Sequence, residues 1–330
     1  MVTIAFFLCY KLIDIDDKVE RYINAIVIWT LFIFATTEVL SVFKMITVVN
    51  LWLCWIGFNL ILVILNIFRK KGNINNHKIH LTRKRNITKI NIVWFIFALG
   101  MICLAVKTVP YNWDSMTYHL PRLFYWLQNG TVGHYAVHND RQVASPVLGA
   151  FVNLQIYTVM NQNDIFINLL QCFSFLTNGV LVYHITKKIK CSESFCVLSA
   201  VLFYSMPIAF SEALTTQVDN YSALWMLCFV YLVIDLLNPD EKILLDKLTL
   251  FRIGTLSLCV AFAYLAKPSV GIGMVFFALW LLIIVIKRKD NVFTLLLYLL
   301  GVGFILVAVL APEFLRNIAT YSALSSPQTG

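Results

Sequence analysis

Charged residues are scarce in this sequence. Lys, Arg, Asp and Glu make up 13% of its 330 residues, whereas 60% are hydrophobic; a soluble domain averages about 25% charged and 45–50% apolar residues. This composition excludes a water-soluble globule, because a single core cannot hide so much apolar surface. The apolar residues come in runs of about 18 to 23, a length that matches the hydrocarbon core of a bilayer.

The sequence also lacks any Cys-x-x-Cys pair, although it has eight cysteines. We therefore expect neither a disulfide framework nor a zinc site. Most of the cysteines lie inside apolar runs, where a thiol behaves as a small apolar side chain. A cleavable signal peptide is not expected either, because Met1–Leu12 has no basic start and no small-residue cleavage site. That segment is too short to span a membrane comfortably.

The long apolar runs predict an all-α, polytopic transmembrane helix bundle of about nine to ten membrane helices. We place the runs at Tyr22–Phe43, Ile46–Phe68, Ile90–Val109, Asp164–Thr186, Ser194–Phe210, Asn220–Leu237, Leu250–Ala266, Pro268–Ile286 and Val292–Ala311.

The basic residues predict how the bundle is oriented. Arg69–Lys89 holds eight Lys and Arg residues, so this loop is expected to be cytoplasmic. Alternation of the runs then puts the basic clusters Lys187–Lys190, Lys242–Arg252 and Lys287–Lys289 on the same side. The net charge of +9 therefore indicates membrane orientation. We expect the lipid bilayer, with its acidic surface, as a partner and no nucleic acid.

One loop on the opposite side is long, and it is rich in aromatic and polar residues. Residues 110–163 have too many aromatics and too little charge to be disordered. Within them Leu120–Leu127 is amphipathic, with Pro121 near its expected start and Gly130 after its expected end. Pro146–Met160 is a second short apolar piece. Both pieces are expected to form helices in the membrane interface.

Polar residues with functional potential gather on this non-cytoplasmic side. Four separate segments contribute, and alternation places all of them at one membrane face. They are Asp114, His119, Arg122, His134, His138, Asp140, Arg141 and Gln142 in the long loop; Glu212, Thr215, Thr216, Gln217 and Asp219; Lys267; and Glu313 and Arg316.

These segments resemble the GT-C superfamily of membrane glycosyltransferases, which includes relatives of the protein O-mannosyltransferases and of the aminoarabinose transferase of bacterial lipid A. The resemblance is carried by NWDSMTYHLPR, followed by RQ and SP further along the same loop. TTQVDN (residues 215–220) is similar to a second polar motif, and AKPS (residues 266–269) resembles a Lys-containing one. The resemblance covers roughly Ile90 to Arg316, and the loop around Asp114 is its most specific part.

The resemblance implies an inverting glycosyltransferase that takes a sugar from a polyprenyl-phosphate donor to a lipid, glycan or protein acceptor. An acidic residue in the first large non-cytoplasmic loop is the superfamily's catalytic signature, and Asp114 matches it. Asp114 would be the general base or would hold a divalent cation, Mg or Mn. The residues expected to contact substrate are Arg122, Arg141 and Lys267 at the phosphate, Trp113 and Tyr118 at the sugar, and His119, Gln142 and Asp219.

We expect two parts in the chain. Residues 1–89 form N-terminal membrane helices and the basic loop, and residues 90–330 form the GT-C-like catalytic module. Members of the superfamily are usually longer, so we expect a fragment or a shortened relative. The predicted location is a bacterial cytoplasmic membrane in the cell envelope, with the active site facing outward.

Simpler interpretations stand beside these. Asp114 and Asp219 are each positioned to cap a helix, Arg122 and Arg141 to reach lipid headgroups, and Lys267 to anchor a helix end. The histidine spacing matches no closed zinc pattern.

Glu38 lies alone in an apolar run, where an ionisable residue is functional by default. The alternative function is a transporter or flippase for a lipid-linked substrate, which would favour charged residues and broken helices near the bilayer midplane and two repeated halves. A third possibility is a non-catalytic scaffold, which would not depend on Asp114.

Overall fold

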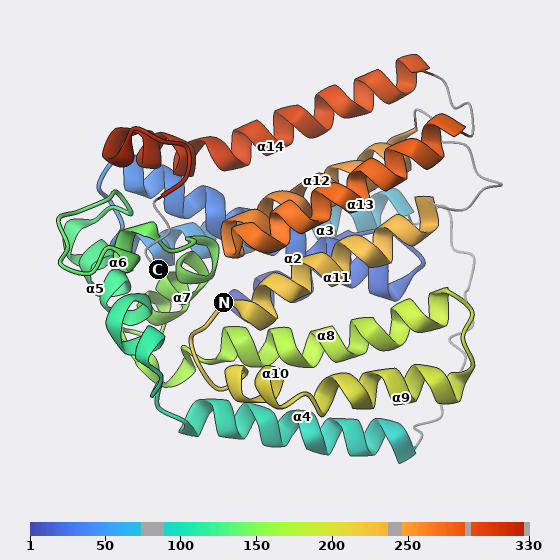
Figure 1. Ribbon diagram of the computed structural model, residues 1–330, viewed down its shortest axis with the longest axis horizontal. Coiled ribbons are helices and arrows are strands. Elements are labelled where there is room, and N and C mark those ends of the chain that lie inside the picture. Colours follow the sequence, from blue (N-terminus) through green and yellow to red (C-terminus); the bar gives the residue numbers. More distant parts are fainter. Residues whose placement is uncertain (74–88, 237–245, 288–291, 327–330) are drawn as a thin grey trace.

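The computed structural model describes residues 1–73, 89–236, 246–287 and 292–326, and no strand occurs in these ranges. The axes of the long helices are roughly aligned, and the short helices α5, α6 and α7 gather at one end of the molecule (Figure 1). The long helices are α2 (Lys18–Val42), α3 (Val48–Asn73), α4 (Lys89–Lys107), α8 (Leu169–Lys188), α11 (Asp219–Leu236), α12 (Lys247–Ala266), α13 (Pro268–Lys287) and α14 (Val292–Tyr321).

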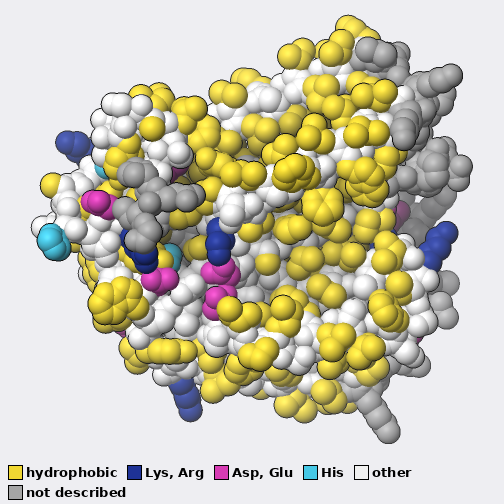
Figure 2. All heavy atoms as spheres, in the orientation of Figure 1, with side chains coloured by type: hydrophobic (Ala, Val, Ile, Leu, Met, Phe, Trp, Pro, Cys, Tyr) yellow, Lys and Arg dark blue, Asp and Glu magenta, His cyan; other side chains and the backbone are white. Residues whose placement is uncertain are grey.

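In the described part of the chain, seven helices are long and apolar enough to cross a membrane: α2, α3, α4, α8, α11, α12 and α14. The central ones are α8 and α11, because 56% of each apolar window is buried inside the protein, against 17% for α3, α4 and α14. Hydrophobic side chains cover the visible face of the long helices (Figure 2). The predicted all-α membrane bundle is therefore confirmed.

The number of spanning helices differs from the predicted nine to ten. The run Ser194–Phe210 is broken into α9 (Glu193–Tyr204) and α10 (Pro207–Glu212), and the apolar stretch Pro268–Ile284 of α13 is among the shorter apolar helices. The break follows from local chemistry: a proline drives the preceding residue out of the helical region. Met206 is accordingly extended, with φ −68° and ψ 114°, and Pro207 begins the next helix.

The same rule separates α12 from α13. Lys267 precedes Pro268 and is extended, with φ −159° and ψ 106°. The two helices then pack tightly, because a Cβ on Gly271 would lie 2.7 Å from the Cα of Tyr264. Lys267 is thereby fixed at a sharp turn between two helices.

The N-terminal helix α1 (Val2–Leu12) runs parallel to the second half of α3. Asparagine side chains of α3 fix the register: Asn59 donates to the carbonyl of Met1 over 3.4 Å, and Asn66 to that of Leu8 over 3.2 Å. One apolar cluster contains residues from α1, α2 and α3 as well as from α7, α11 and α12. Residues on both sides of position 89 therefore share a core.

The long loop forms two helices near the predicted positions. α5 (Leu120–Asn129) has Pro121 in its first turn and ends at Gly130, as predicted. Gly130 has a φ of +66°, and a Cβ there would lie 2.5 Å from the carbonyl oxygen of Lys44. Glycine is thus required where the end of α5 meets the turn between α2 and α3.

The second loop helix, α7 (Leu148–Val159), differs from its predicted place in the membrane interface. All of its residues except Ile156 are buried. Gln155 donates to the hydroxyl of Thr37 in α2 over 2.8 Å. α7 is therefore enclosed by protein, and it anchors the long loop to α2.

Candidate functional site

The two ends of the bundle carry different sets of charged residues. We call the end where α8 and α11 finish and α12 begins the basic end, because Lys187, Lys188 and Arg252 lie there. The opposite end, with α5, α6 (Arg141–Ala144) and α7, is the loop end. The predicted site residues belong to the loop end.

Asp114 precedes η2 (Ser115–His119), a single π-helical turn of the kind often found at functional sites. The Asp114 side chain makes no capping hydrogen bond. Asn112 does that work instead, since its Oδ1 accepts from the backbone N–H of Ser115 over 3.2 Å. The capping interpretation of Asp114 is therefore not the arrangement found, and its carboxylate is left for other partners.

Three side chains surround the Asp114 carboxylate. Gln217 Nε2 donates to Oδ2 over 3.3 Å, and Arg141 Nη1 lies 3.8 Å from Oδ1. The side chains of Arg141 and Asp114 are 41% and 27% exposed. The third is Tyr118: burial raises the pKa of its phenol, and the nearby Asp114 carboxylate raises it further, so this phenol stays neutral at physiological pH. We call Asp114, Tyr118, Arg141 and Gln217 the Asp114 cluster.

A buried contact brings the two polar motifs together. The hydroxyls of Ser115 and Thr216 lie 2.7 Å apart, and the backbone N–H of Thr216 also donates to Ser115 Oγ over 3.3 Å. The sequence predicted only that these motifs share a membrane face. The structure joins them, and it does so one residue away from Asp114 and Gln217.

A second charged group lies two residues beyond Gln217. Lys267, at the turn between α12 and α13, donates to the Asp219 carboxylate at the start of α11. Their side chains are 42% and 32% exposed. Glu212 is nearby: burial and, after it, the charge of Asp219 raise its pKa to about 7 against the opposing effect of Lys267. Lys267 therefore has one carboxylate partner, Asp219, and a second carboxyl group close by.

Arg122 has a different role from the predicted one. It is fully buried, and its guanidinium donates to the carbonyl oxygens of Gln142 and Ser145, each over 2.8 Å. Pro146 accepts over 2.9 Å, and Arg141 more weakly over 3.4 Å. Because the guanidinium donates to backbone carbonyl oxygens, we remove Arg122 from the phosphate-binding candidates. It holds the end of α6 and, through it, the backbone of Arg141.

The remaining predicted contacts fall into two groups. Trp113 is 78% exposed beside Asp114 and is open to a ligand. His119 is buried against the ring of Tyr118, and burial lowers its pKa to about 3, with Arg122 adding to the effect. Gln142 is occupied, since it donates to the carbonyl of Thr117 over 3.0 Å. His119 and Gln142 therefore support the site from inside.

Glu38 is paired, not isolated. Both of its carboxylate oxygens accept from Arg316, over 2.7 and 2.8 Å, and Arg316 also donates to Glu313 over 2.9 Å. All three side chains are less than 15% exposed. The network ties α2 to the end of α14, a 30-residue helix about 45 Å long that reaches past the bundle into the loop end. An acidic side chain in an apolar helix is usually paired, and Arg316 is the partner of Glu38.

A divalent cation at Asp114 stays a prediction. In the described ranges no three His, Cys, Asp or Glu side chains gather as metal ligands do. The donor set at Asp114 fits such an ion poorly, because one carboxylate is present where several oxygen ligands are needed, and a guanidinium lies 3.8 Å away.

No family model matches the sequence, and no curated protein or solved structure matches it.

Proposed function

We propose that the protein is an inverting membrane glycosyltransferase that uses a polyprenyl-phosphate sugar. The main support is the environment of Asp114. Asn112 caps the turn in its place, so the Asp114 carboxylate makes no capping hydrogen bond, and its side chain is partly exposed to solvent. It lies where two motifs more than 100 residues apart converge.

The chemistry follows from these groups. An acceptor hydroxyl attacks the anomeric carbon of the donor sugar while the bond from that carbon to the phosphate oxygen breaks. Asp114 accepts the hydroxyl proton as general base. The lipid phosphate leaves as a stable anion, so no strong general acid is required.

Arg141 and Lys267 are the cations available to the leaving phosphate. Each is about two-fifths exposed and is held by a carboxylate, Asp114 for one and Asp219 for the other. A phosphate that enters between them would compete for charge-assisted hydrogen bonds already aimed at the site. Trp113 offers an exposed aromatic surface to the sugar.

The basic loops favour an orientation in which the loop end faces away from the cytoplasm. In a bacterial cytoplasmic membrane this face meets outward-flipped lipid donors. The acceptor, whether lipid, glycan or protein, would approach from the same side.

One observation favours the alternative, a transporter or flippase of a lipid-linked substrate. α9 and α10 form a broken helix inside one apolar run, and broken helices are typical of transporters. The break lies near the loop end, however, and the Asp114 cluster is also at that end, where the glycosyltransferase needs its site.

The test is sugar transfer in membrane vesicles, with a panel of radiolabelled polyprenyl-phosphate hexoses and pentoses. Asp114→Asn is expected to lower transfer by about 10²–10⁴-fold, the usual contribution of a general base. Asp140→Asn is the matched control, because Asp140 lies in the same loop, is exposed and makes no capping bond; it should stay within about twofold, far below that range.

Transfer retained by Asp114→Asn would refute the assignment of the base. No transfer by wild type with any donor would contradict the proposal, and passage of labelled lipid across the vesicle bilayer would then support the transporter.

A further inference from the structure

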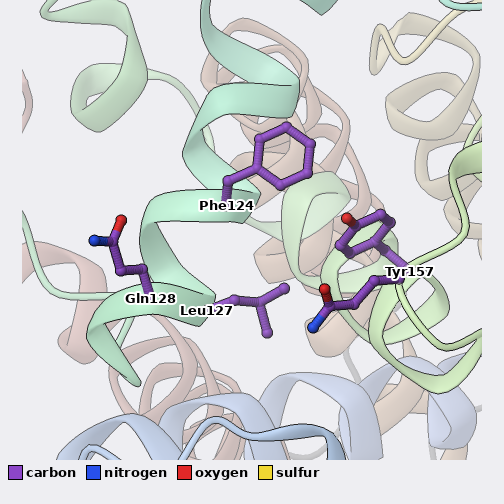
Figure 3. A pocket seen from close by; sticks show the side chains of 5 residues that line it. Phe124, Leu127, Gln128 and Tyr157 are labelled. Carbon is purple, nitrogen blue, oxygen red and sulfur yellow. The ribbon is translucent and has the colours of Figure 1, made fainter.

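A hollow with a volume of about 290 Å³ lies between α5 and the last turn of α7, on the opposite side of α5 from the buried Arg122. Helix α5 contributes one face to it, through residues three and four positions apart. Figure 3 shows Phe124 and Leu127 of α5 facing Tyr157 of α7 across this space. The lining residues are Phe124, Leu127, Gln128, Tyr157 and Gln162.

Tyr157 is the buried part of this lining. It is 9% exposed, and its ring meets the edge of Phe124 with centroids 5.5 Å apart. Its hydroxyl points into the hollow (Figure 3) and has no hydrogen-bond partner within the described ranges. Burial raises the pKa of Tyr157, so the hydroxyl is a neutral donor at physiological pH. The ring is held by the protein, and the hydroxyl, which faces the open space of the hollow, is available to a ligand.

Gln162 is brought to the hollow by an unusual turn. Asn161 and Gln162 both have left-handed backbones, with φ of 56° and 61°, a conformation that residues other than glycine rarely adopt. The Gln162 N–H donates to the carbonyl of Tyr157 over 2.8 Å, which closes the turn. The side-chain amides of Gln162 and Gln128 have no partner among the described residues.

The lining contains no charged residue. It offers two amides, each with two donors and an acceptor with two lone pairs, and one phenolic hydroxyl. Two aromatic rings flank these groups. Sugar hydroxyls both donate and accept, and the carbon faces of a sugar ring pack on aromatic rings. The volume is close to the lower bound of about 300 Å³ for small-molecule sites, which suits a single unit.

We propose that this hollow binds one unit of a neutral saccharide. Phe124 lies ten residues after Asp114, roughly 15 Å along a helix, so the hollow is separate from the Asp114 cluster. The inference goes beyond the proposed function and does not depend on it. If Asp114 transfers sugar, the hollow would hold the far part of a glycan-bearing acceptor.

The test is calorimetric binding to the full chain in lipid nanodiscs. The probes are a neutral glucan tetrasaccharide and a uronic acid tetrasaccharide. The neutral one is expected to bind with a Kd of about 1 mM or tighter, and the acidic one at least about tenfold more weakly, because the lining has no Lys or Arg to pair with its carboxylate. Tyr157→Phe and Gln162→Ala should each weaken neutral binding by about three- to tenfold.

Matched controls are Tyr125→Phe and Asn129→Ala, which change exposed residues of α5 outside the hollow and should leave Kd unchanged. Asp114→Asn should also leave it unchanged, which separates this inference from the proposed function. Nanodiscs with a glycosyl-diacylglycerol that compete with the tetrasaccharide would identify a glycolipid as the source of the sugar. Equal binding of both tetrasaccharides, unchanged binding by both lining variants, or no binding of the neutral probe would overturn the proposal.

Discussion

The buried ion pairs of the basic end and the Asp114 cluster of the loop end use their charges in different ways. At the basic end, Arg252 makes two hydrogen bonds of 2.7 and 2.8 Å to Glu20, whose side chain is fully buried. Lys188 binds Asp235 over 2.7 Å. In the Asp114 cluster the corresponding separations are 3.3 and 3.8 Å, and the side chains are partly exposed.

The difference indicates which charges hold the fold and which can act on a ligand. A buried, closely paired charge has no donor or acceptor to spare, and removing its partner leaves an uncompensated charge inside the protein. A loosely held, partly exposed pair contributes little to stability and exchanges its partner easily. Substitutions at the two kinds of site should therefore differ in what they change.

Arg252→Met should cost about 3–5 kcal/mol of unfolding free energy, because the Glu20 carboxylate loses its buried partner. Thermal unfolding of the purified protein in nanodiscs measures this. Arg69→Met is the control at the same end, since its partner Asp14 is 75% exposed; the expected cost is within about 1 kcal/mol. Equal losses for the two variants would contradict the division.

Arg122→Lys should cost about 1–3 kcal/mol, because an ammonium cannot replace the planar fork that serves several carbonyls around α6. Transfer should fall as well, since the backbone of Arg141 is released. Arg141→Lys gives the contrast: we expect weaker transfer with unchanged unfolding. The idea that Arg122 only positions α6 would be wrong if Arg122→Lys kept full stability and lost transfer alone.

His119 should make the protein sensitive to acid. Its folded pKa is about 3 against an ordinary 6.5, so the unfolded state binds more protons, and stability falls as pH drops below about 6.5. His119→Gln should reduce this slope between pH 6.5 and 4, in unfolding temperatures measured across that range. Part of the slope should remain in this variant, because burial also lowers the pKa of His134, to about 4. His138→Gln, at an exposed position, should match wild type.

Glu212 should give the smallest effect, with the opposite sign. Its folded pKa of about 7 exceeds the ordinary 4.5, so its contribution to stability is present below about pH 4.5 and is lost as pH rises through about 7. Between pH 6.5 and 8 the unfolding temperature of wild type should decline slightly, and that of Glu212→Gln should decline less. Glu193→Gln, at an exposed site of the basic end, should behave as wild type; an unchanged slope in Glu212→Gln would contradict the raised pKa.

The sequence predicted what depends on local pattern. Apolar runs of membrane length foretold most of the long helices, Pro121 and Gly130 bounded α5, and the basic loops grouped the polar segments at one end. Pro207 indicates the break between α9 and α10, although the apolar run Ser194–Phe210 was predicted as one continuous helix. These features depend on residues close together in the chain.

What the sequence did not predict depends on tertiary contact. Arg122 looked like a surface cation, and only packing puts it among the carbonyls of α6. Glu38 and Arg316 are 278 residues apart, so nothing local pairs them. Asn112 and Asp114 are both suited to cap the turn that begins at Ser115. Because Asn112 accepts the hydrogen bond from the Ser115 N–H, the Asp114 carboxylate is free of that role, and the sequence does not show which of the two side chains caps.

The most direct test measures transfer and thermal unfolding together for Asp114→Asn and Arg252→Met. The account predicts that Asp114→Asn loses transfer with its unfolding temperature unchanged, and that Arg252→Met is strongly destabilised but transfers sugar at a temperature where it is still folded. Transfer by Asp114→Asn, or unfolding of Asp114→Asn as severe as that of Arg252→Met, would contradict the division between the buried ion pairs that hold the fold and the partly exposed Asp114 cluster.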